Sequence, residues 1–400
     1  MSLRHIVIPS WPHHTPPKFP TFVLASRVQA KIQRDLLDWK VAATLAAGAE
    51  PPYTPTPPLP TVISFTPEPT YTQGRRQVKA PNTVQSTRLR APLHVTPPSA
   101  PSYLGDSTGG SSGNVFRPII ARTPRGGLTT YHGPGQVVLW PVVDLWSPSH
   151  PHFLVGGYIS LLEATTAAVL RKVFGLNAFT DPEHRGVWVN GLNTDIPPPP
   201  PSTSSPGVPT GADQGGDGVR SESRSNKDEV AILRESELYS KEAYKRGEEP
   251  RKIAAVGVHL RRHITCFGTA VNLSVPVTGP EDINPWARFV PCGITGRRVT
   301  SVAAQLRDVG LPPPPPSPSS PSPLESEGFA SAWAAEFADR LYNDATGGRR
   351  ATADPRITVR TTVERVDWER WKQEENFDED GDDTFGWEET ERRSQLPSGR

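Results

Sequence analysis

Hydrophobic and polar positions follow two different periods along this chain. Short apolar runs between polar or turn-forming residues predict strands at residues 3–8, 62–65, 137–140 and 187–189. Longer segments that carry apolar residues along one side predict helices at residues 22–39, 157–174 and 328–341. Because the two kinds of element are interspersed along the chain, the pattern predicts an α/β fold.

The two later helices have the pattern of helices that pack in a core. One side of the helix at 157–174 holds Leu162, Val169, Leu170 and Val173, and Gly175 follows as a candidate C-cap. The helix at 328–341 has a stripe with residues four apart, namely Trp333, Phe337 and Leu341. We expect both stripes to face the interior.

Low-complexity sequence interrupts this pattern. Of the 400 residues, 47 are proline and only 35% are hydrophobic, so much of the chain cannot contribute to a core. The composition predicts disordered insertions at about 81–114, 194–250 and 312–327, and an acidic, disordered tail at 344–400. The rest of residues 1–343 then forms one domain. The proline runs in two insertions favour spacers over ligands for an aromatic groove, and the tail favours a solvated segment over a ligand for a basic partner.

Charge and cysteine content narrow the class of protein. With 43 basic and 42 acidic residues the net charge is +1, which gives no overall field for nucleic acid or an anionic membrane. No apolar run is long enough to span a bilayer, so we expect no membrane partner. The two cysteines, Cys266 and Cys292, are too few for a disulfide framework, which favours a reducing compartment and leaves either thiol available for chemistry.

The first 34 residues lack Asp and Glu but contain five Lys or Arg residues, a bias that fits a mitochondrial presequence weakly. The alternative is that this segment is structural, because residues 3–8 have the pattern of a strand and residues 22–39 that of an amphipathic helix. We favour the structural interpretation.

The segment at 125–136, RGGLTTYHGPGQ, has the character of a ligand-binding loop and strand. Its four glycines allow positive φ and close approach of the backbone to a ligand, while Thr129, Thr130 and Tyr131 favour an extended strand between two bends. Arg125 and His132 are candidates for binding or catalysis. For His132 we favour a positional role over that of a general base, and Arg125 is equally suited to bracing the loop.

Cys292 is the candidate nucleophile. It lies between Pro291 and Gly293, where a turn would expose the thiol and let a backbone amide approach a bound carbonyl. A free thiol has a pKa of about 8.5, so catalysis needs a neighbouring base or cation, for which Lys252 at the start of an apolar strand is the candidate. From spacing alone this pair is a guess. Cys266 is the weaker candidate, because a cysteine in a strand-like run is more often a small buried residue.

Four motifs occur in the order of a known family: residues 125–136, 252–257 (KIAAVG), 268–272 (GTAVN) and 291–294 (PCGI). Together they resemble the lipoyl(octanoyl) transferase family, in its eukaryotic, fungal mitochondrial type, over roughly residues 61–302. The resemblance implies a mixed sheet flanked by helices, of the biotin/lipoate protein ligase type.

The resemblance also implies an activity and a site. Members move an octanoyl group from acyl carrier protein to a lysine of lipoyl domains, through a thioester on a cysteine that corresponds to Cys292, paired with Lys252. The substrate-binding residues implied are Arg125, Gly126, Gly127, Leu128, Thr129, Thr130, Tyr131, His132, Ala255, Val256, Gly257, Gly268, Thr269 and Ala270. No cofactor and no metal are expected, and the ten histidines show no metal-ligand spacing.

The partners implied are octanoyl-acyl carrier protein as donor, and as acceptors the lipoyl domains of 2-oxoacid dehydrogenase complexes and the glycine cleavage H protein, in mitochondria. Two positions depart from the family, since Phe267 and Pro67 stand where histidines are usual. Two alternatives stay open: an ATP-dependent lipoate-protein ligase, which would not need Cys292, and an inactive scaffold that binds lipoyl domains.

Overall fold

The computed structural model describes most of the chain apart from the low-complexity tracts. The described residues are 1–46 without 13 and 15, 55–95, 114–192, 250–290, 298–310 without 309, 324–343, 358–367 and 370. Cys292 and its two neighbours in the motif lie outside them.

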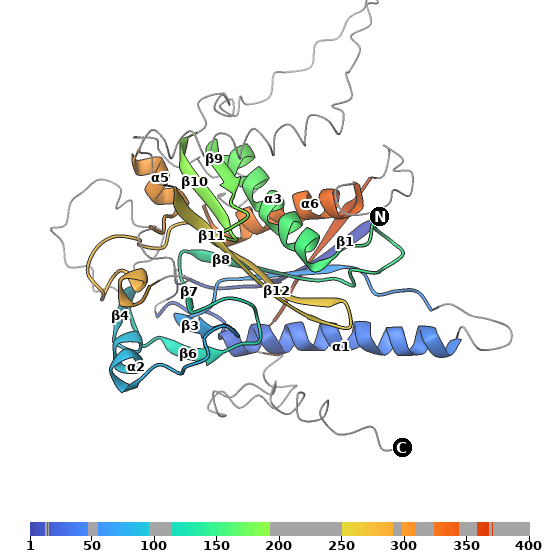
Figure 1. Ribbon diagram of the computed structural model, residues 1–400, viewed down its shortest axis with the longest axis horizontal. Coiled ribbons are helices and arrows are strands. Elements are labelled where there is room, and N and C mark those ends of the chain that lie inside the picture. Colours follow the sequence, from blue (N-terminus) through green and yellow to red (C-terminus); the bar gives the residue numbers. More distant parts are fainter. Residues whose placement is uncertain are drawn as a thin grey trace, which may run out of the picture.

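One large mixed sheet organises these residues (Figure 1). Its strand order is β13-β1-β2-β8-β12-β11-β10-β9. The pairs β13-β1 and β1-β2 are parallel and all the others are antiparallel. The strands are β1 (Ser2–Ile8), β2 (Thr61–Phe65), β8 (Gln136–Val142), β9 (Leu176–Thr180), β10 (Val187–Leu192), β11 (Arg251–Arg261), β12 (Ile264–Asn272) and β13 (Arg360–Arg365).

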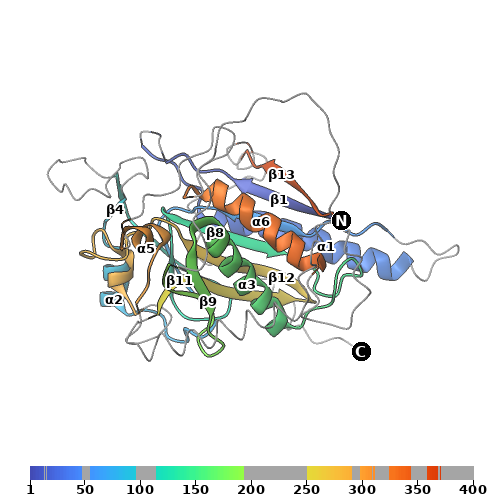
Figure 2. The ribbon, with the colours of Figure 1, turned by 90° about the horizontal axis from the view of Figure 1, so that it is seen from above.

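Helices cover both faces of this sheet. The helix α1 (Phe22–Ala46) runs along one face, whereas α3 (Val155–Phe174) and α6 (Ser326–Asn343) cross the other, as Figures 1 and 2 show. Two shorter helices, η1 (Pro285–Arg288) and α5 (Val302–Asp308), follow β12. The predicted mixed sheet flanked by helices is therefore confirmed.

Smaller sheets extend the face on which α1 lies (Figure 1). The strand β3 (Thr70–Gln73) pairs in parallel with β6 (Ile119–Arg122) and antiparallel with β7 (Thr130–His132). Beside them, β4 (Leu93–Val95) pairs with β5 (Asn114–Phe116), and the helix α2 (Thr83–Leu89) precedes β4. These elements carry the glycine-rich segment over the sheet.

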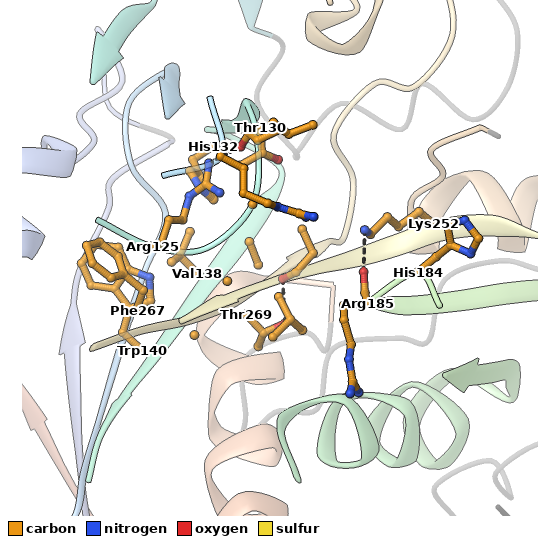
Figure 3. A pocket seen from close by; sticks show the side chains of 18 of the residues that line it. Arg125, Thr130, His132, Val138, Trp140, His184, Arg185, Lys252, Phe267 and Thr269 are labelled. Atoms are coloured by element: carbon orange, nitrogen blue, oxygen red, sulfur yellow. Dashed lines mark hydrogen bonds between the residues drawn. The ribbon is translucent and has the colours of Figure 1, made fainter. Parts of the chain in front are cut away.

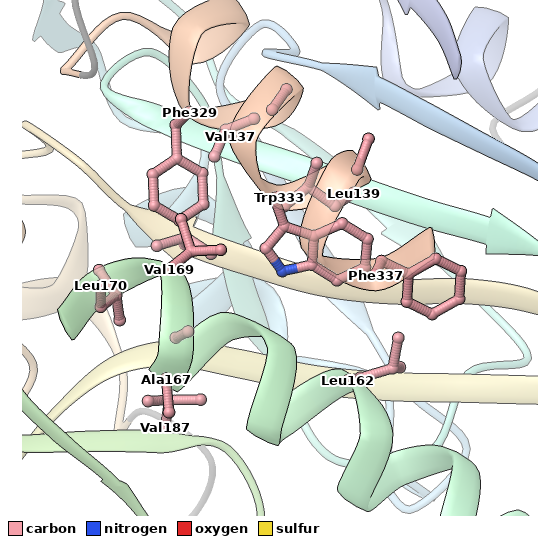
Figure 4. Packing of buried hydrophobic residues seen from close by; sticks show 14 of the residues in the cluster. Val137, Leu139, Leu162, Ala167, Val169, Leu170, Val187, Phe329, Trp333 and Phe337 are labelled. Atoms are coloured by element: carbon pink, nitrogen blue, oxygen red, sulfur yellow. The ribbon is translucent and has the colours of Figure 1, made fainter. Parts of the chain in front are cut away.

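Strict alternation along β8 divides the core into two halves. Val137 and Leu139 pack with α3 and α6, whereas Val138 and Trp140 pack with α1 on the other face. In Figure 4 the α6 residues Phe329, Trp333 and Phe337 lie against α3 and β8. The predicted core stripes of both helices are confirmed.

The ends of two helices test the sequence pattern closely. The helix α1 begins at Phe22, as predicted, but continues to Ala46. The helix α3 ends where Gly175 adopts φ 65° and donates its N–H to Arg171 O and Leu170 O, which confirms the predicted C-cap.

Because β1 pairs with both β2 and β13, residues 2–8 are part of the fold, which confirms the structural interpretation of this segment.

The prediction of disorder is wrong for part of the first insertion, at 81–114, and for part of the tail, at 344–400. Within 81–114, Asn82 and Gln85 form a capping box that starts α2, and Leu89 and Leu93 are buried. Within 344–400, β13 adds to the edge of the sheet beside β1. There Arg4 donates to both carboxylate oxygens of Glu364, at 2.9 and 2.7 Å. In both places a short segment forms a regular element because a few of its residues make specific contacts, although the sequence around it has the composition of a disordered tract.

The third insertion also ends earlier than predicted. The helix α6 begins at Ser326, and Ser326 Oγ lies 2.7 Å from Thr66 Oγ1. Among the described residues, no helix combines the length and the apolar character that a bilayer crossing requires.

Acid should destabilise the fold through His5, which is fully buried and whose Nε2 lies 2.8 Å from Ser64 Oγ. Burial lowers its pKa from 6.5 to about 4, although Glu327 opposes the change. The unfolded chain therefore binds a proton below pH 6.5 that the folded chain excludes, and stability falls as pH drops from 6.5 to 4, by on the order of 3 kcal/mol. We expect chemical denaturation to show a smaller loss in His5→Gln over this range. Equal losses in the two proteins would contradict this assignment.

Candidate active site

A cavity of about 250 Å³ lies where the small sheet and the first turn of α1 meet the large sheet (Figure 3). Its wall combines the glycine-rich segment, β8, β11, β12 and the loop before β10. The sequence-predicted residues that line it are Arg125, Gly127, Leu128, Thr130, His132, Lys252, Ala255, Val256, Gly257, Gly268, Thr269 and Ala270. Segments far apart in the sequence thus converge on one cavity.

Arg125 braces the glycine-rich loop. Its Nη2 donates to Thr72 O at 2.7 Å, to Thr72 Oγ1 at 2.8 Å and to Leu128 O at 2.9 Å, and its Nη1 donates to Gly126 O at 3.0 Å. The guanidinium therefore ties the loop to β3 while the side chain stays buried. This geometry supports the bracing role over direct chemistry.

His132 is buried in a neutral, hydrogen-bonded state. Gln136 Nε2 donates to Tyr131 O and Asn272 Oδ1, so Gln136 Oε1 is free to accept from His132 Nδ1 at 2.8 Å. Burial, with a contribution from nearby Arg125, lowers the pKa of His132 to about 3. An imidazole with that pKa is a weak base at neutral pH, which supports the positional role.

Lys252 is aimed at the loop before β10. Its Nζ donates to Arg185 O at 2.7 Å (Figure 3). The same Nζ lies 5.3 Å from the ring centroid of Trp188. Gly186 leaves the space that this side chain occupies, because a Cβ there would lie 2.5 Å from Lys252 Cε. The amine is thereby fixed at one end of the cavity.

Glu163 on α3 holds the loop that receives Lys252. This buried carboxylate accepts from Gly186 N at 2.6 Å and from Arg185 Nη1 at 3.0 Å. Burial raises the pKa of Glu163, while the bonds from Gly186 and Arg185 oppose that rise. A chain of contacts thus runs from the core helix to the Lys252 amine.

The strands β11 and β12 bring small residues to the cavity floor. Ala255 pairs with Ala270, and Gly257 pairs with Gly268. A Cβ on Gly268 would lie 2.2 Å from Leu139 O, and one on Gly257 would lie 3.2 Å from Gly126 O. Gly268 is required because a backbone carbonyl approaches closely there, whereas a side chain at Gly257 would make a tight contact with the loop.

The two cysteines differ. Cys266 is fully buried within β12, and burial raises the pKa of its thiol to about 12, so at neutral pH it is not a thiolate. Cys292 lies outside the described residues. The residues that follow its motif pair directly with the lysine strand, since Lys252 N donates to Arg298 O and Thr300 N donates to Lys252 O, both at 2.9 Å.

Some residues of the cavity differ from the predicted set. Gly126, Thr129 and Tyr131 do not line it, and Tyr131 packs in the cluster beneath β3 instead. The lining residues that the sequence did not indicate as part of the site are Phe22, Arg76, Val138, Trp140, Glu183, His184, Arg185 and Phe267. The period-2 pattern of β8 places Val138 and Trp140 on one face, but nothing in the sequence shows which face the cavity adjoins.

Most of the residues that line the cavity lie within a segment that matches a known family model. The family model described as the lipoyl protein ligase A/B catalytic domain matches residues 118–313. A mitochondrial octanoyl-[acyl-carrier-protein]:protein N-octanoyltransferase of Danio rerio is 29% identical over 247 residues, which cover 62% of this chain and 67% of that protein. A probable octanoyltransferase of Schizosaccharomyces pombe is 26% identical over 253 residues, which cover 62% and 69%.

Bacterial proteins match over a shorter part. The octanoyltransferase of Rickettsia conorii is 29% identical over 185 residues, 46% of this chain and 58% of its own length. Among solved structures, lipoate-protein ligase A bound with ATP has a TM-score of 0.40 at 13% identity and covers 95% of each chain, too low a score to carry weight. Residues 118–313 therefore match the lipoyl protein ligase A/B catalytic domain, and the chain is similar to octanoyltransferases over 62% of its length.

Proposed function

We propose that this protein moves an octanoyl group from acyl carrier protein, through a thioester on Cys292, to a lysine of a lipoyl domain. The observation that carries the proposal is a cavity with one amine-bearing end, at Lys252, and an opposite apolar end, in a chain whose relatives are octanoyltransferases. Burial of the octanoyl tail in such a cavity would contribute roughly 5 kcal/mol, at about 0.8 kcal/mol per methylene.

The first half-reaction transfers the acyl group to the enzyme. The Cys292 thiol gives its proton to the Lys252 amine, and the thiolate attacks the carbonyl carbon of the carrier thioester. A new carbon–sulfur bond forms as the bond to the carrier sulfur breaks. The departing carrier thiolate then takes the proton from the Lys252 ammonium, so the amine is regenerated.

The second half-reaction transfers the acyl group to the acceptor. The neutral amine of the acceptor lysine attacks the thioester carbonyl, an amide bond forms, and the bond to Cys292 sulfur breaks. Lys252 takes the proton that the acceptor nitrogen loses and returns it to the Cys292 thiolate. Backbone amides beside Cys292 are suitable donors to the oxyanion in both steps.

Lys252 is supported as the proton carrier by how it is held. Its Nζ donates to the backbone carbonyl of Arg185 at 2.7 Å, which fixes the amine at one end of the cavity, where the reacting groups would meet it. The pairing of Arg298 and Thr300 with Lys252 also tethers the chain a few residues beyond Cys292 next to this lysine.

The names of two relatives support a carrier-protein donor and a mitochondrial compartment for the proposed reaction. We infer donation by acyl carrier protein and acceptance by lipoyl domains of 2-oxoacid dehydrogenase complexes and by the glycine cleavage H protein. We also infer a mitochondrial location, as for the relatives of fish and frog. We propose residues 1–343 as the catalytic domain, and β13, which follows them in the chain, adds an edge strand to its sheet.

Intact-protein mass spectrometry after mixing with octanoyl-loaded carrier tests the nucleophile. We expect an octanoyl adduct on the parent and on Cys266→Ser, and none on Cys292→Ser, because the Cys266 thiol is buried and protonated. An adduct that survives in Cys292→Ser but disappears in Cys266→Ser would overturn the assignment. If the parent acylates lipoyl domains only when ATP is present, the protein is a ligase instead.

A further inference from the structure

The cavity has two chemically different ends (Figure 3). Lys252, His184 and Arg185 lie at one end, and Phe267, Trp140 and Val138 lie at the other. If the acyl carbonyl reacts beside Lys252, the methyl end of the acyl chain points toward the aromatic residues. In that orientation, the space beside these aromatic residues, which form the end wall of the cavity, determines how long an acyl chain fits.

The end wall is a tightly packed aromatic cluster. Trp140 contacts Phe22 with ring centroids 5.2 Å apart and Phe267 with centroids 5.1 Å apart, in edge-to-face geometry. Phe65 supports Trp140 from behind, with centroids 4.6 Å apart. All four side chains are at least 97% buried. Rings packed in this way do not move aside for additional methylenes without losing their mutual contacts.

The backbone at Phe267 is bent to place its ring in this wall. Successive side chains of a strand point to opposite faces of the sheet, so Phe267 should point away from Cys266. Both side chains nevertheless pack in the cluster on the α1 face. The reason is that Phe267 has φ 60°, in the left-handed region, which is an outlier for a bulky residue. Its N–H is held by Gln29 Oε1 of α1 at 2.6 Å.

We propose that Phe267, with Phe22 and Trp140, sets the upper limit of acyl-chain length in this protein, so that octanoyl is accepted and longer saturated chains are discriminated against. The proposal rests on the proposed function, because it assumes that the acyl carbonyl lies at the Lys252 end. A chain that is too long leaves methylenes outside the cavity or displaces the wall. Each methylene that stays in water lowers the affinity about fourfold relative to the same methylene buried in the cavity.

Phe267→Gly is the most informative variant, because glycine adopts the positive φ without strain while the ring is removed. Phe22→Leu opens the wall from α1 and serves if the first variant does not fold. Phe65→Leu is the matched control, since Phe65 belongs to the same cluster but does not line the cavity. Circular dichroism and thermal melting establish which variants are folded.

Competition between octanoyl-, decanoyl- and dodecanoyl-loaded carriers, read as the ratio of adducts by intact mass, measures chain-length selection. We expect the ratio of decanoyl to octanoyl adduct to rise at least tenfold in Phe267→Gly, to rise less in Phe22→Leu, and to stay within twofold of the parent in Phe65→Leu. Unchanged ratios in folded Phe267→Gly and Phe22→Leu would overturn the proposal.

Calorimetric binding of free octanoate, decanoate and dodecanoate separates this proposal from the proposed function. If the parent forms no adduct with any carrier, the thioester route fails. The end wall still predicts that decanoate binds more tightly to Phe267→Gly than to the parent, relative to octanoate. Equal relative affinities in the two proteins would refute the end wall whatever the transfer assay shows.

Discussion

Replacing Lys252 with methionine is expected to reduce acyl transfer by about 10²–10⁴-fold, the usual contribution of a positioned proton carrier. Methionine keeps most of the aliphatic stem but removes the amine that donates to Arg185 O. Both half-reactions lose their proton carrier, so the single-turnover rates of adduct formation and of adduct decay should fall together. Rapid-quench measurements with octanoyl-loaded carrier and a lipoyl domain follow the two rates.

The matched control is Lys172→Met on α3. The Lys172 side chain is 67% exposed and pairs with Glu336 at the surface, so its loss should leave both rates within twofold of the parent. A folded Lys252→Met protein that retains transfer within threefold of the parent would remove Lys252 from the mechanism. A decrease in one half-reaction alone would restrict its role to that step.

Trp333→Ala is expected to lower the free energy of unfolding by about 3–5 kcal/mol, the range for removal of a large aromatic residue from a core. Trp333 is fully buried between α6 and α3 and stacks on Phe337 (Figure 4). It also donates its Nε1 proton to Thr166 Oγ1 at 2.9 Å. The substitution leaves a cavity and removes the hydrogen bond to Thr166 Oγ1. Thermal unfolding should show a midpoint lower by on the order of 10 °C.

Trp146→Ala provides the comparison, because the Trp146 ring is 52% exposed and stacks only on the surface, against His263 and His152. Its removal should cost less than about 1 kcal/mol. If the two tryptophan variants unfold at the same temperature, α6 does not contribute to the core as the structure indicates.

The sequence predicted well those elements whose pattern is set locally. The start of α1 at Phe22, the Gly175 cap of α3 and the stripe around Trp333 follow from periodicity and capping, which act within a few residues. The glycine-rich segment was predicted as a ligand-binding loop and strand, and it does border the cavity. The residue roles inside that cavity came from the family resemblance and stay proposals.

Features that depend on contacts between distant segments could not be predicted. Phe22 and Trp140 join the cavity only because α1 lies across β8, and the bent backbone at Phe267 is held by Gln29 from another element. The edge strand β13 depends on β1, which precedes it by most of the chain. Local composition carries no information about such pairings, which is why part of the predicted tail is a strand.

The central claim is that the acyl group passes through the protein as a thioester without ATP. The direct measurement is to isolate the octanoyl adduct, free of carrier and nucleotide, and then add a lipoyl domain while following both masses. The account predicts that the octanoyl mass leaves the enzyme and appears on the acceptor at equal rates. An adduct that persists, or an acceptor that is acylated only after ATP is added, would contradict it.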